Sequence, residues 1–186
     1  MVRSLNSGFR NSLVATAIVL GMTGGAFAAL KPGDAAPDFT TTAALAGKTS
    51  SFDMKAALKK GPVVLYFFPK AFTQGCTLEA HAFAEASPEF NKMGATVYGI
   101  SRDDIDTLKK FSTEACRDQF AVLSDADGKT VRAYDAGHAT RTDMANRISY
   151  VIDKDGKVVF AHQGSDPVEH VQQTMDAVKK LSAVAR

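Results

Sequence analysis

The feature that most constrains this chain is a continuous run of apolar and aromatic residues, Val63 to Phe68, bounded by Gly61, Pro62 and Pro69. A strand with one face in water alternates apolar and polar residues, so an uninterrupted run indicates a strand that is buried on both faces. Such strands occur inside sheets that carry helices on both sides. The run therefore predicts an α/β domain in which this strand lies in the interior of the sheet.

Apolar patterns predict further strands and helices along the rest of the chain. Strands and helices alternate, and a final hairpin precedes the last helix. This order predicts an α/β domain with a mixed β-sheet and helices on both faces. Pro88 should kink or split the helix in which it lies, because proline removes a helix hydrogen bond. The expected strands are two short ones within residues 31–54, then Val63–Phe68, Thr96–Ile100, Phe120–Leu123, Ser149–Asp153 and Val158–His162, and helices should begin near Cys76, Asp103, Lys129 and Pro167.

The first 28 residues are typical of a secretory signal peptide. Arg3 and Arg10 form a positive start, residues 13–25 are uncharged and mostly apolar, and residues 26–28 have the small-large-small pattern of a cleavage site. An uncleaved membrane anchor is the alternative, but the apolar stretch is at the short end of the roughly 17 to 25 residues that a span needs. We therefore expect residues 1–28 to be removed and one domain, residues 29–186, to be exported to the bacterial periplasm without stable membrane association.

The charge of the chain gives no reason to expect a nucleic-acid partner. The sequence contains 22 Lys and Arg against 20 Asp and Glu, and Arg3 and Arg10 of the predicted signal account for the whole excess. Nucleic-acid binding usually requires Lys and Arg clustered on one face. No heptad pattern or other added interface is visible in the sequence either.

Two cysteines, Cys76 and Cys116, are present. In an exported protein, one structural disulfide is their common use. Cys76, however, follows the buried strand and a short loop, so it lies at the expected start of a helix. The N-terminus of a helix carries about half a positive charge and unpaired N–H groups, which favour thiolate over thiol. Thr73, three residues earlier, can place its hydroxyl beside the sulfur, and this arrangement favours a reactive cysteine.

The segment from Pro69 to Cys76 resembles the active-site motif of the peroxiredoxins, in which proline, threonine and cysteine stand where this chain has Pro69, Thr73 and Cys76. Residues 67–70, 75–77 and 79–80 are similar to the branch called bacterioferritin comigratory protein or peroxiredoxin Q. The resemblance extends over most of the chain in the order of the family. The other similar segments are residues 31–39, 99–103, 123–125 and 147–156.

The resemblance implies a thioredoxin-like fold and a thiol peroxidase acting on hydrogen peroxide and organic hydroperoxides. Cys76 would be the nucleophile, Thr73 and Pro69 would shape its pocket, and Arg147 would hold the thiolate and orient the peroxide. The thiolate would attack the peroxide and become a sulfenic acid, which a second thiol returns to the reduced state. The external donor would be a thioredoxin-like protein or a small thiol. Members of this branch are often monomers, so the resemblance also implies a monomer. This chemistry needs no metal or other cofactor, and no histidine pair lies at metal-ligand spacing.

The identity of the resolving thiol stays open. Many members of the branch carry the resolving cysteine five residues after the nucleophile, and that position is His81 here. Cys116 is the remaining candidate. A Cys76–Cys116 disulfide would need local unwinding, because a disulfide requires Cα atoms about 4.4 to 6.8 Å apart. In the alternative, an external thiol resolves a one-cysteine enzyme and Cys116 is a buried packing residue.

Two other functions are weighed against the peroxidase. An exported thiol–disulfide exchange protein usually needs Cys-x-x-Cys, and Thr73 occupies the first position of that spacing. This substitution argues against the exchange protein. A non-enzymatic domain with a structural Cys76–Cys116 disulfide would instead have two inaccessible sulfurs and form no sulfenic acid.

Four polar residues have less defined expectations. Arg102 and Arg141 rival Arg147, but they lie away from the position that matches the family. His138 lies in a polar loop that can line a substrate entrance, although a solvated loop histidine is the more common case. Glu79 is expected to form a local cap or salt bridge and to take no part in catalysis.

Overall fold

The computed structural model describes Met1 and residues 29–184. The seven strands of the described part are β1 (Thr40–Leu45), β2 (Lys48–Asp53), β3 (Val63–Phe67), β4 (Thr96–Ser101), β5 (Ala121–Ser124), β6 (Ile148–Ile152) and β7 (Val158–Gln163). They form one sheet in the order β2-β1-β5-β4-β3-β6-β7. β3 pairs in parallel with β4 and antiparallel with β6, so the sheet is mixed, as predicted.

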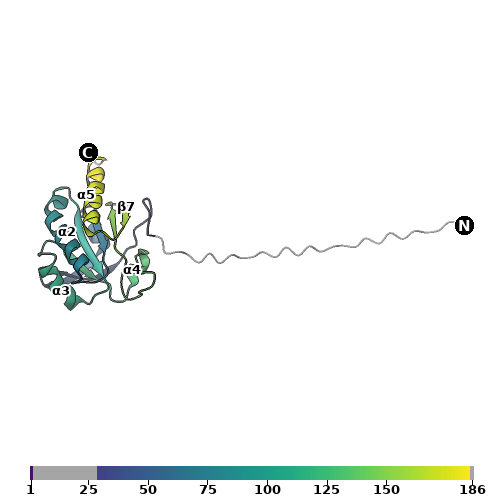
Figure 1. The fold of residues 1–186 in the computed structure, drawn as a ribbon. Helices are drawn as coiled ribbons and strands as arrows, with labels where there is room; N and C mark the ends of the chain where they lie inside the picture. The colour runs from purple at the N-terminus through teal and green to yellow at the C-terminus, as the bar shows by residue number, and fades with distance from the viewer. Residues whose placement is uncertain (2–28, 185–186) are drawn as a thin grey trace.

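Helices cover both faces of this sheet. In the described part they are α1 (Met54–Leu58), α2 (Gln74–Lys92), α3 (Ile105–Glu114), α4 (Lys129–Ala133) and α5 (Pro167–Val184). Buried residues of α2, α3 and α5 share one core cluster with the sheet, whereas those of α1 and α4 belong to the other. Figure 1 shows α2 and α3 on one side of the molecule and α4 on the other. The predicted α/β fold class is confirmed.

β3 confirms the prediction made from the apolar run. All five of its residues are buried, and neighbouring strands pair with both of its edges. Because side chains alternate along a strand, Val64 and Tyr66 face the core beneath α2, whereas Leu65 and Phe67 face the core beneath α4. Because both edges are paired, the end of β3 is held in position, and the loop that leads to α2 starts from this end.

The sequence predicts a kink or a split at Pro88, and the split is wrong, because α2 continues without a break through this residue. Proline has no N–H to donate along the helix. In the turn before it, the Ser87 hydroxyl donates to the Phe83 carbonyl over 2.8 Å. Phe83 and Phe90 are fully buried on either side of the proline. This burial offsets the lost hydrogen bond and keeps the helix continuous.

α5 packs most of its apolar residues against the sheet. Val171 and Val178 are buried, and Met175 and Leu181 are partly buried against the same core cluster. Val168 is 40% exposed, whereas His170 and Thr174 are fully buried. The helix therefore presents a histidine to the interior of the domain in its first turns.

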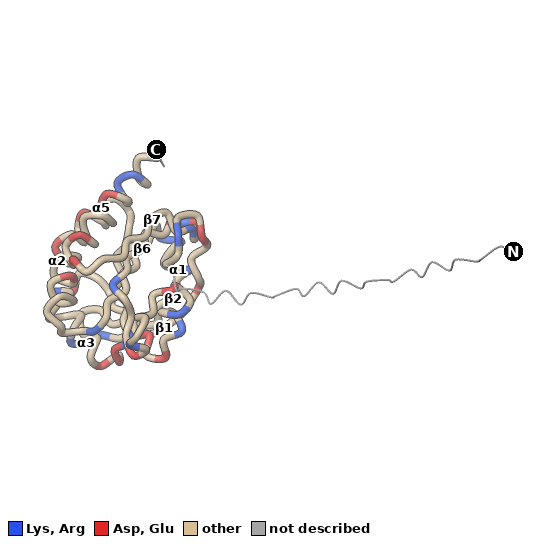
Figure 2. Tube along the Cα trace, turned by 45° about the vertical axis from the view of Figure 1, so that its right-hand side comes forward, with Lys and Arg blue, Asp and Glu red and all other residues tan. Residues whose placement is uncertain are grey.

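The predicted signal peptide lies outside the described residues, apart from Met1. Among the residues that the structure describes, no helix is both long and apolar enough to cross a membrane. Figure 2 shows Lys and Arg interspersed with Asp and Glu around the domain in that view. The mixture agrees with the balanced charge of the sequence.

Candidate active site

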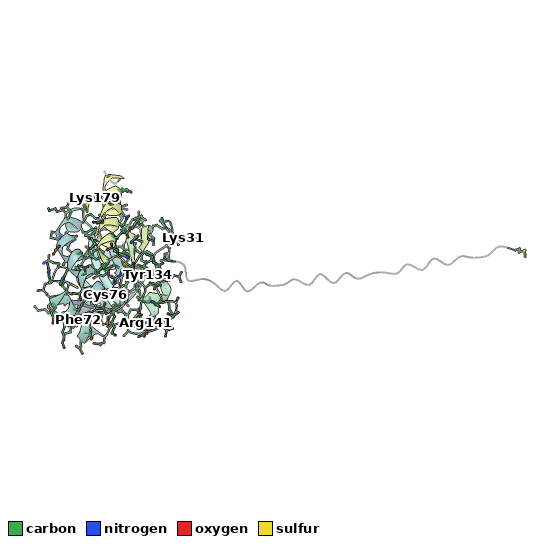
Figure 3. The ribbon with its side chains drawn as sticks, viewed as in Figure 1. Lys31, Phe72, Cys76, Tyr134, Arg141 and Lys179 are labelled. Atoms are coloured by element: carbon green, nitrogen blue, oxygen red, sulfur yellow. The ribbon has the colours of Figure 1, made fainter. Side chains whose placement is uncertain are left out.

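Cys76 lies in the first turn of α2. Thr73 is the N-cap residue, with an extended backbone, and Cys76 is the third residue of the helix. The first N–H groups of a helix have no partner within it, so the sulfur lies close to the positive end of the helix dipole. The Cys76 side chain is nonetheless buried, with 1% of its surface exposed. Figure 3 labels Cys76 within the body of the domain.

Asp103, which follows β4, holds the loop that leads to Cys76. One oxygen of its carboxylate accepts hydrogen bonds from the Ala71 N–H over 2.7 Å and from the Ser101 hydroxyl over 2.8 Å. The other oxygen is 3.6 Å from Nζ of Lys70. Sequence patterns predict only a helix start near Asp103. They miss this contact because Asp103 and the loop are 32 residues apart in the chain.

Phe72 turns the chain into α2. Its φ of 64° lies in the left-handed region, which bulky residues rarely adopt. Its ring packs edge-on against Phe111 of α3, with 5.2 Å between the ring centroids. Figure 3 shows Phe72 near the lower edge of the domain, below Cys76. The aromatic contact and Asp103 together hold this loop in the shape that starts the helix.

Arg147, immediately before β6, is the arginine that reaches the sulfur. Its Nη2 is 3.5 Å from Sγ of Cys76, and its Nη1 donates to the carboxylate of Glu79. Nη2 also stands 3.2 Å from where a Cβ on Gly75 would lie, so a larger residue at position 75 would press on the guanidinium. A permanently charged guanidinium at this distance stabilises a thiolate.

The two rival arginines lie elsewhere. Arg102 donates to the backbone carbonyls of Thr142 and Ala126. Arg141 is exposed, and Figure 3 labels it at the lower right of the domain. Of the three arginines, Arg147 is therefore the one that contacts the sulfur of Cys76.

Glu79 is completely buried, which contradicts the expectation of a local cap or salt bridge. Its partner, Arg147, is 68 residues away in the chain. Burial raises the pKa of Glu79 to about 8, although Arg147 opposes this shift. Its second oxygen, Oε1, has no hydrogen-bond partner among the described residues and lies 3.9 Å from Nδ1 of His170. A glutamate one turn into a helix usually faces water, so sequence patterns alone miss this site.

Thr73 is the N-cap residue of α2, and its hydroxyl has a hydrogen-bond partner in the preceding loop. It donates to the Lys70 carbonyl over 2.9 Å, because the loop brings that carbonyl within reach. Its oxygen stays available as an acceptor. Pro69 and Arg147 border an open hollow of about 630 Å³ on the surface. The other residues around this hollow are His138, Asn146, Gln163, Gly164 and Ser165.

The remaining histidines occupy separate places. His81 is half-buried on α2. The rings of His162 and His170 lie 4.5 Å apart, centroid to centroid. Within the part of the chain that the structure describes, no three His, Cys, Asp or Glu side chains are grouped to hold a metal ion.

Cys116 lies beyond the end of α3, in a turn and not within the helix. Both cysteines are free and buried, and both belong to the core cluster beneath α2, α3 and α5. The structural disulfide of the non-enzymatic alternative is therefore not formed here. Burial raises the pKa of the Cys116 thiol far above its usual range. Cys116 is thus a neutral thiol as long as it stays in the core.

We expect the folded, reduced protein to protect Cys116 from thiol reagents. In a Cys76→Ser variant at pH 8, iodoacetamide should modify Cys116 at least about 100-fold more slowly in native buffer than in denaturant, because burial withholds both thiolate and access. Mass spectrometry of timed samples measures the two rates. Equal rates would mean that Cys116 is exposed in solution.

Comparison with known proteins decides the family. Residues 32–161 match the model of the AhpC/TSA family. The chain belongs to this peroxiredoxin family. It is 35% identical over 156 residues to the chloroplastic peroxiredoxin Q of Populus jackii, covering 83% of this chain and 71% of that protein. It is 33% identical over 154 residues to that of Arabidopsis thaliana, covering 82% and 69%.

Solved structures agree with this assignment of the peroxiredoxin. Peroxidoxin BcpB of Mycobacterium tuberculosis superposes with a TM-score of 0.74 and 29% identity, covering 82% of this chain and 98% of that chain. Peroxiredoxin Q of Xanthomonas campestris gives a TM-score of 0.67 and 27% identity, covering 76% and 90%. The peroxiredoxin therefore has the thioredoxin-like fold and belongs to the peroxiredoxin Q branch. It is a thiol peroxidase, and the exchange-protein and non-enzymatic alternatives are not favoured.

Proposed function

We propose that Cys76 is the peroxide-reactive residue of this peroxidase, and that hydrogen peroxide and organic hydroperoxides are its substrates. The observation that carries the proposal is the 3.5 Å separation between Sγ of Cys76 and Nη2 of Arg147 at the N-terminus of α2. The helix N-terminus and the guanidinium both favour thiolate over thiol. The fork of guanidinium N–H groups also suits a peroxide oxygen, which it can hold in line with the sulfur.

The reaction follows from these groups. The Cys76 thiolate attacks the terminal oxygen of the peroxide, an S–O bond forms and the O–O bond breaks. The sulfur loses two electrons and becomes a sulfenic acid, while the leaving oxygen takes a proton and departs as water or an alcohol. Arg147 stabilises negative charge first on the sulfur and then on the leaving oxygen.

Substrate entry is proposed through the hollow beside Arg147. Pro69 borders this hollow together with Arg147. Thr73 follows at the start of the helix, with its hydroxyl oxygen available to accept a hydrogen bond from the peroxide. Because Cys76 is buried, a peroxide needs a small movement of this loop to reach the sulfur.

Trapping of the sulfenic acid tests the proposed nucleophile. Reduced protein without residues 1–28 is treated with one equivalent of hydrogen peroxide and a sulfenic-acid trap such as dimedone, and the adduct is located by peptide mass spectrometry. We expect the adduct on Cys76 in a variant that lacks Cys116. If Cys76 of that variant carries no adduct, the proposal is contradicted.

We propose that Cys116 resolves the sulfenic acid. It is the second of two cysteines in the chain, and it is buried in the same core cluster as Cys76. Its position in a turn after α3 supports local unwinding, since no helix interior has to open. The Cys116 thiol would attack the sulfur of Cys76, a disulfide would form and water would leave. An external dithiol, a thioredoxin-like protein, or a small thiol would then reduce the disulfide.

Replacement of Cys116 should stop the cycle at the sulfenic acid. We expect wild-type protein, oxidised without reductant, to lose two hydrogen masses and to resist the trap, whereas Cys116→Ala should keep a sulfenic acid that the trap labels in nearly every molecule. Intact-mass spectrometry measures both products. If the wild type is trapped as completely as the variant, an external thiol resolves the sulfenic acid and Cys116 has only a packing role.

The proposed place of this cycle is the periplasm. The support is the signal-like pattern of residues 1–28, and the reductant would then be an exported thiol protein or a small thiol in that compartment. We propose that the enzyme acts as a monomer. Cell fractionation of the full chain, followed by N-terminal sequencing and sedimentation of the product, tests location, cleavage and oligomeric state.

A further inference from the structure

A buried group of ionisable side chains extends from Cys76 into α5. Arg147 contacts both Cys76 and Glu79, and Oε1 of Glu79 lies 3.9 Å from Nδ1 of His170. Glu79 and His170 have no exposed side-chain surface, and Arg147 has 12%. We call these four residues the Cys76 cluster. The reaction proposed above uses Cys76 and Arg147 and leaves Glu79 and His170 without a role.

The surroundings of His170 allow it to change protonation in place. Its Nε2 is 3.1 Å from the carbonyl oxygen of Gly164, which can only accept, so Nε2 carries a hydrogen. Its Nδ1 is 2.8 Å from the hydroxyl of Ser149 on β6. A hydroxyl donates to a bare ring nitrogen and accepts from a protonated one. The ring therefore keeps both partners whether or not Nδ1 holds a proton.

The charges of the Cys76 cluster require such a change. Arg147 is always positive, and ionised Glu79 balances it while Cys76 is a thiol. When Cys76 becomes a thiolate, the cluster would hold two negative charges against one positive charge. An unbalanced charge in a buried site is unfavourable. One further proton on Glu79 or His170 makes the cluster neutral again.

Other ionisable groups face this pair from each neighbouring element. His162 of β7 packs against the His170 ring, and Glu169 of α5 lies 3.8 Å from His162. Asp166, before α5, raises the proton affinity of His170, whereas His162 lowers it. Burial raises the pKa of Tyr66 of β3, and the charge of Glu79 acts in the same direction. Arg147 is the residue that contacts Glu79 directly.

Burial favours the neutral form of both Glu79 and His170. It raises the pKa of Glu79 to about 8 and lowers the pKa of His170 to about 4. Because the two groups are in contact, the proton belongs to the pair and not to one atom. The pKa of Glu79 lies close to neutral pH, so the pair can be ionised beside the Cys76 thiol and can take up one proton when the thiolate forms.

We propose that His170 is a positioning residue of the peroxidase site, and that it enables the Glu79–His170 pair to take up one proton when Cys76 ionises. The S–H bond of Cys76 breaks, an O–H or N–H bond forms on the pair, and no electron is transferred. The proton keeps Glu79 from competing with the thiolate for Arg147. This inference rests on the proposed role of Cys76.

A titration of the thiolate tests the proposal. Its ultraviolet absorbance is followed against pH in a Cys116→Ala background, with a Cys76→Ser protein as blank. Glu79→Gln keeps the shape but removes the competing charge, so we expect its titration midpoint to move to lower pH. His170→Gln removes the basic ring, so we expect its midpoint to move about one unit higher, which is about tenfold less thiolate below the midpoint.

The controls separate this role from a structural one. His162→Gln removes a neighbouring ring that lowers the proton affinity of His170, so its midpoint should not move to higher pH. His170→Asn has the same expected direction as His170→Gln and decides the result if the first variant does not fold. Damage to the fold would move the titration midpoints of the Glu79 and His170 variants in the same direction. Movement in the same direction, or no movement of either His170 variant, would overturn the proposal.

The titration does not depend on turnover. It measures the thiolate and uses no peroxide, so the midpoints can move as expected even if the trap never labels Cys76. That result would overturn the proposed function and leave the proton coupling in place. If the trap labels Cys76 but the titration midpoints do not move, the proposed function stands and the proton coupling is overturned.

Discussion

Replacing Cys76 with serine is expected to lower kcat/KM for hydrogen peroxide by about 10⁴-fold or more, because the reaction then lacks its nucleophile. A serine hydroxyl stays protonated at neutral pH, so the dipole of α2 and the charge of Arg147 have no anion to stabilise. The substitution replaces the buried sulfur atom with an oxygen atom and should leave the fold intact. Stopped-flow measurement of peroxide consumption with excess reductant provides the rate.

The matched control for this variant is the other buried cysteine. Cys116→Ala, assayed for a single oxidation by peroxide, should react within about threefold of wild type, since Cys116 is proposed to act only after the O–O bond has broken. Circular dichroism of both variants checks folding. A Cys76→Ser protein that retains more than about a hundredth of the wild-type rate would mean that another group attacks the peroxide.

Replacing Arg147 with methionine is expected to lower the rate of peroxide reduction by about 100- to 1,000-fold, the usual loss when one preorganised donor is removed. Methionine fills similar volume without charge or N–H groups. The thiolate then loses the cation 3.5 Å away, and the peroxide loses its donor fork. Glu79 would be left buried without its cation and would become protonated, because its partner for the ionised form is gone.

Two further variants define what Arg147 contributes. Arg147→Lys keeps the charge but not the planar fork, so we expect an intermediate loss of about tenfold. Arg141→Met removes an exposed arginine that lies away from Cys76 and should change the rate by less than about twofold. If Arg147→Met and Arg141→Met have the same rate, the contact with Cys76 does not serve the reaction.

Much of the fold follows from local sequence patterns. The apolar run of β3 predicts a doubly buried interior strand, and the order of strands and helices predicts the mixed sheet. These predictions succeed because burial on both faces and helical spacing are written in neighbouring residues. Pro88 is the exception, since its local effect is outweighed by the burial of Phe83 and Phe90 in the core.

The site divides in a similar way. Position at the start of a helix is a local property, so the sequence predicts that Cys76 lies there with Thr73 three residues before it. The partners of a buried side chain depend on which surfaces meet, and Glu79 therefore cannot be read from its own helix. Its burial follows from the packing of α2 against α5 and from Arg147, 68 residues away.

By itself, the sequence determines the buried strand, the helix that begins around Cys76, and the resemblance that names Arg147. Only the tertiary structure decides that Arg147 contacts the sulfur, that Glu79 is buried against it and that His170 stands behind Glu79. The physical reason is the range of the forces involved. Propensity and apolar periodicity act over a few residues, whereas the balance of buried charges depends on atoms that packing brings together from distant parts of the chain.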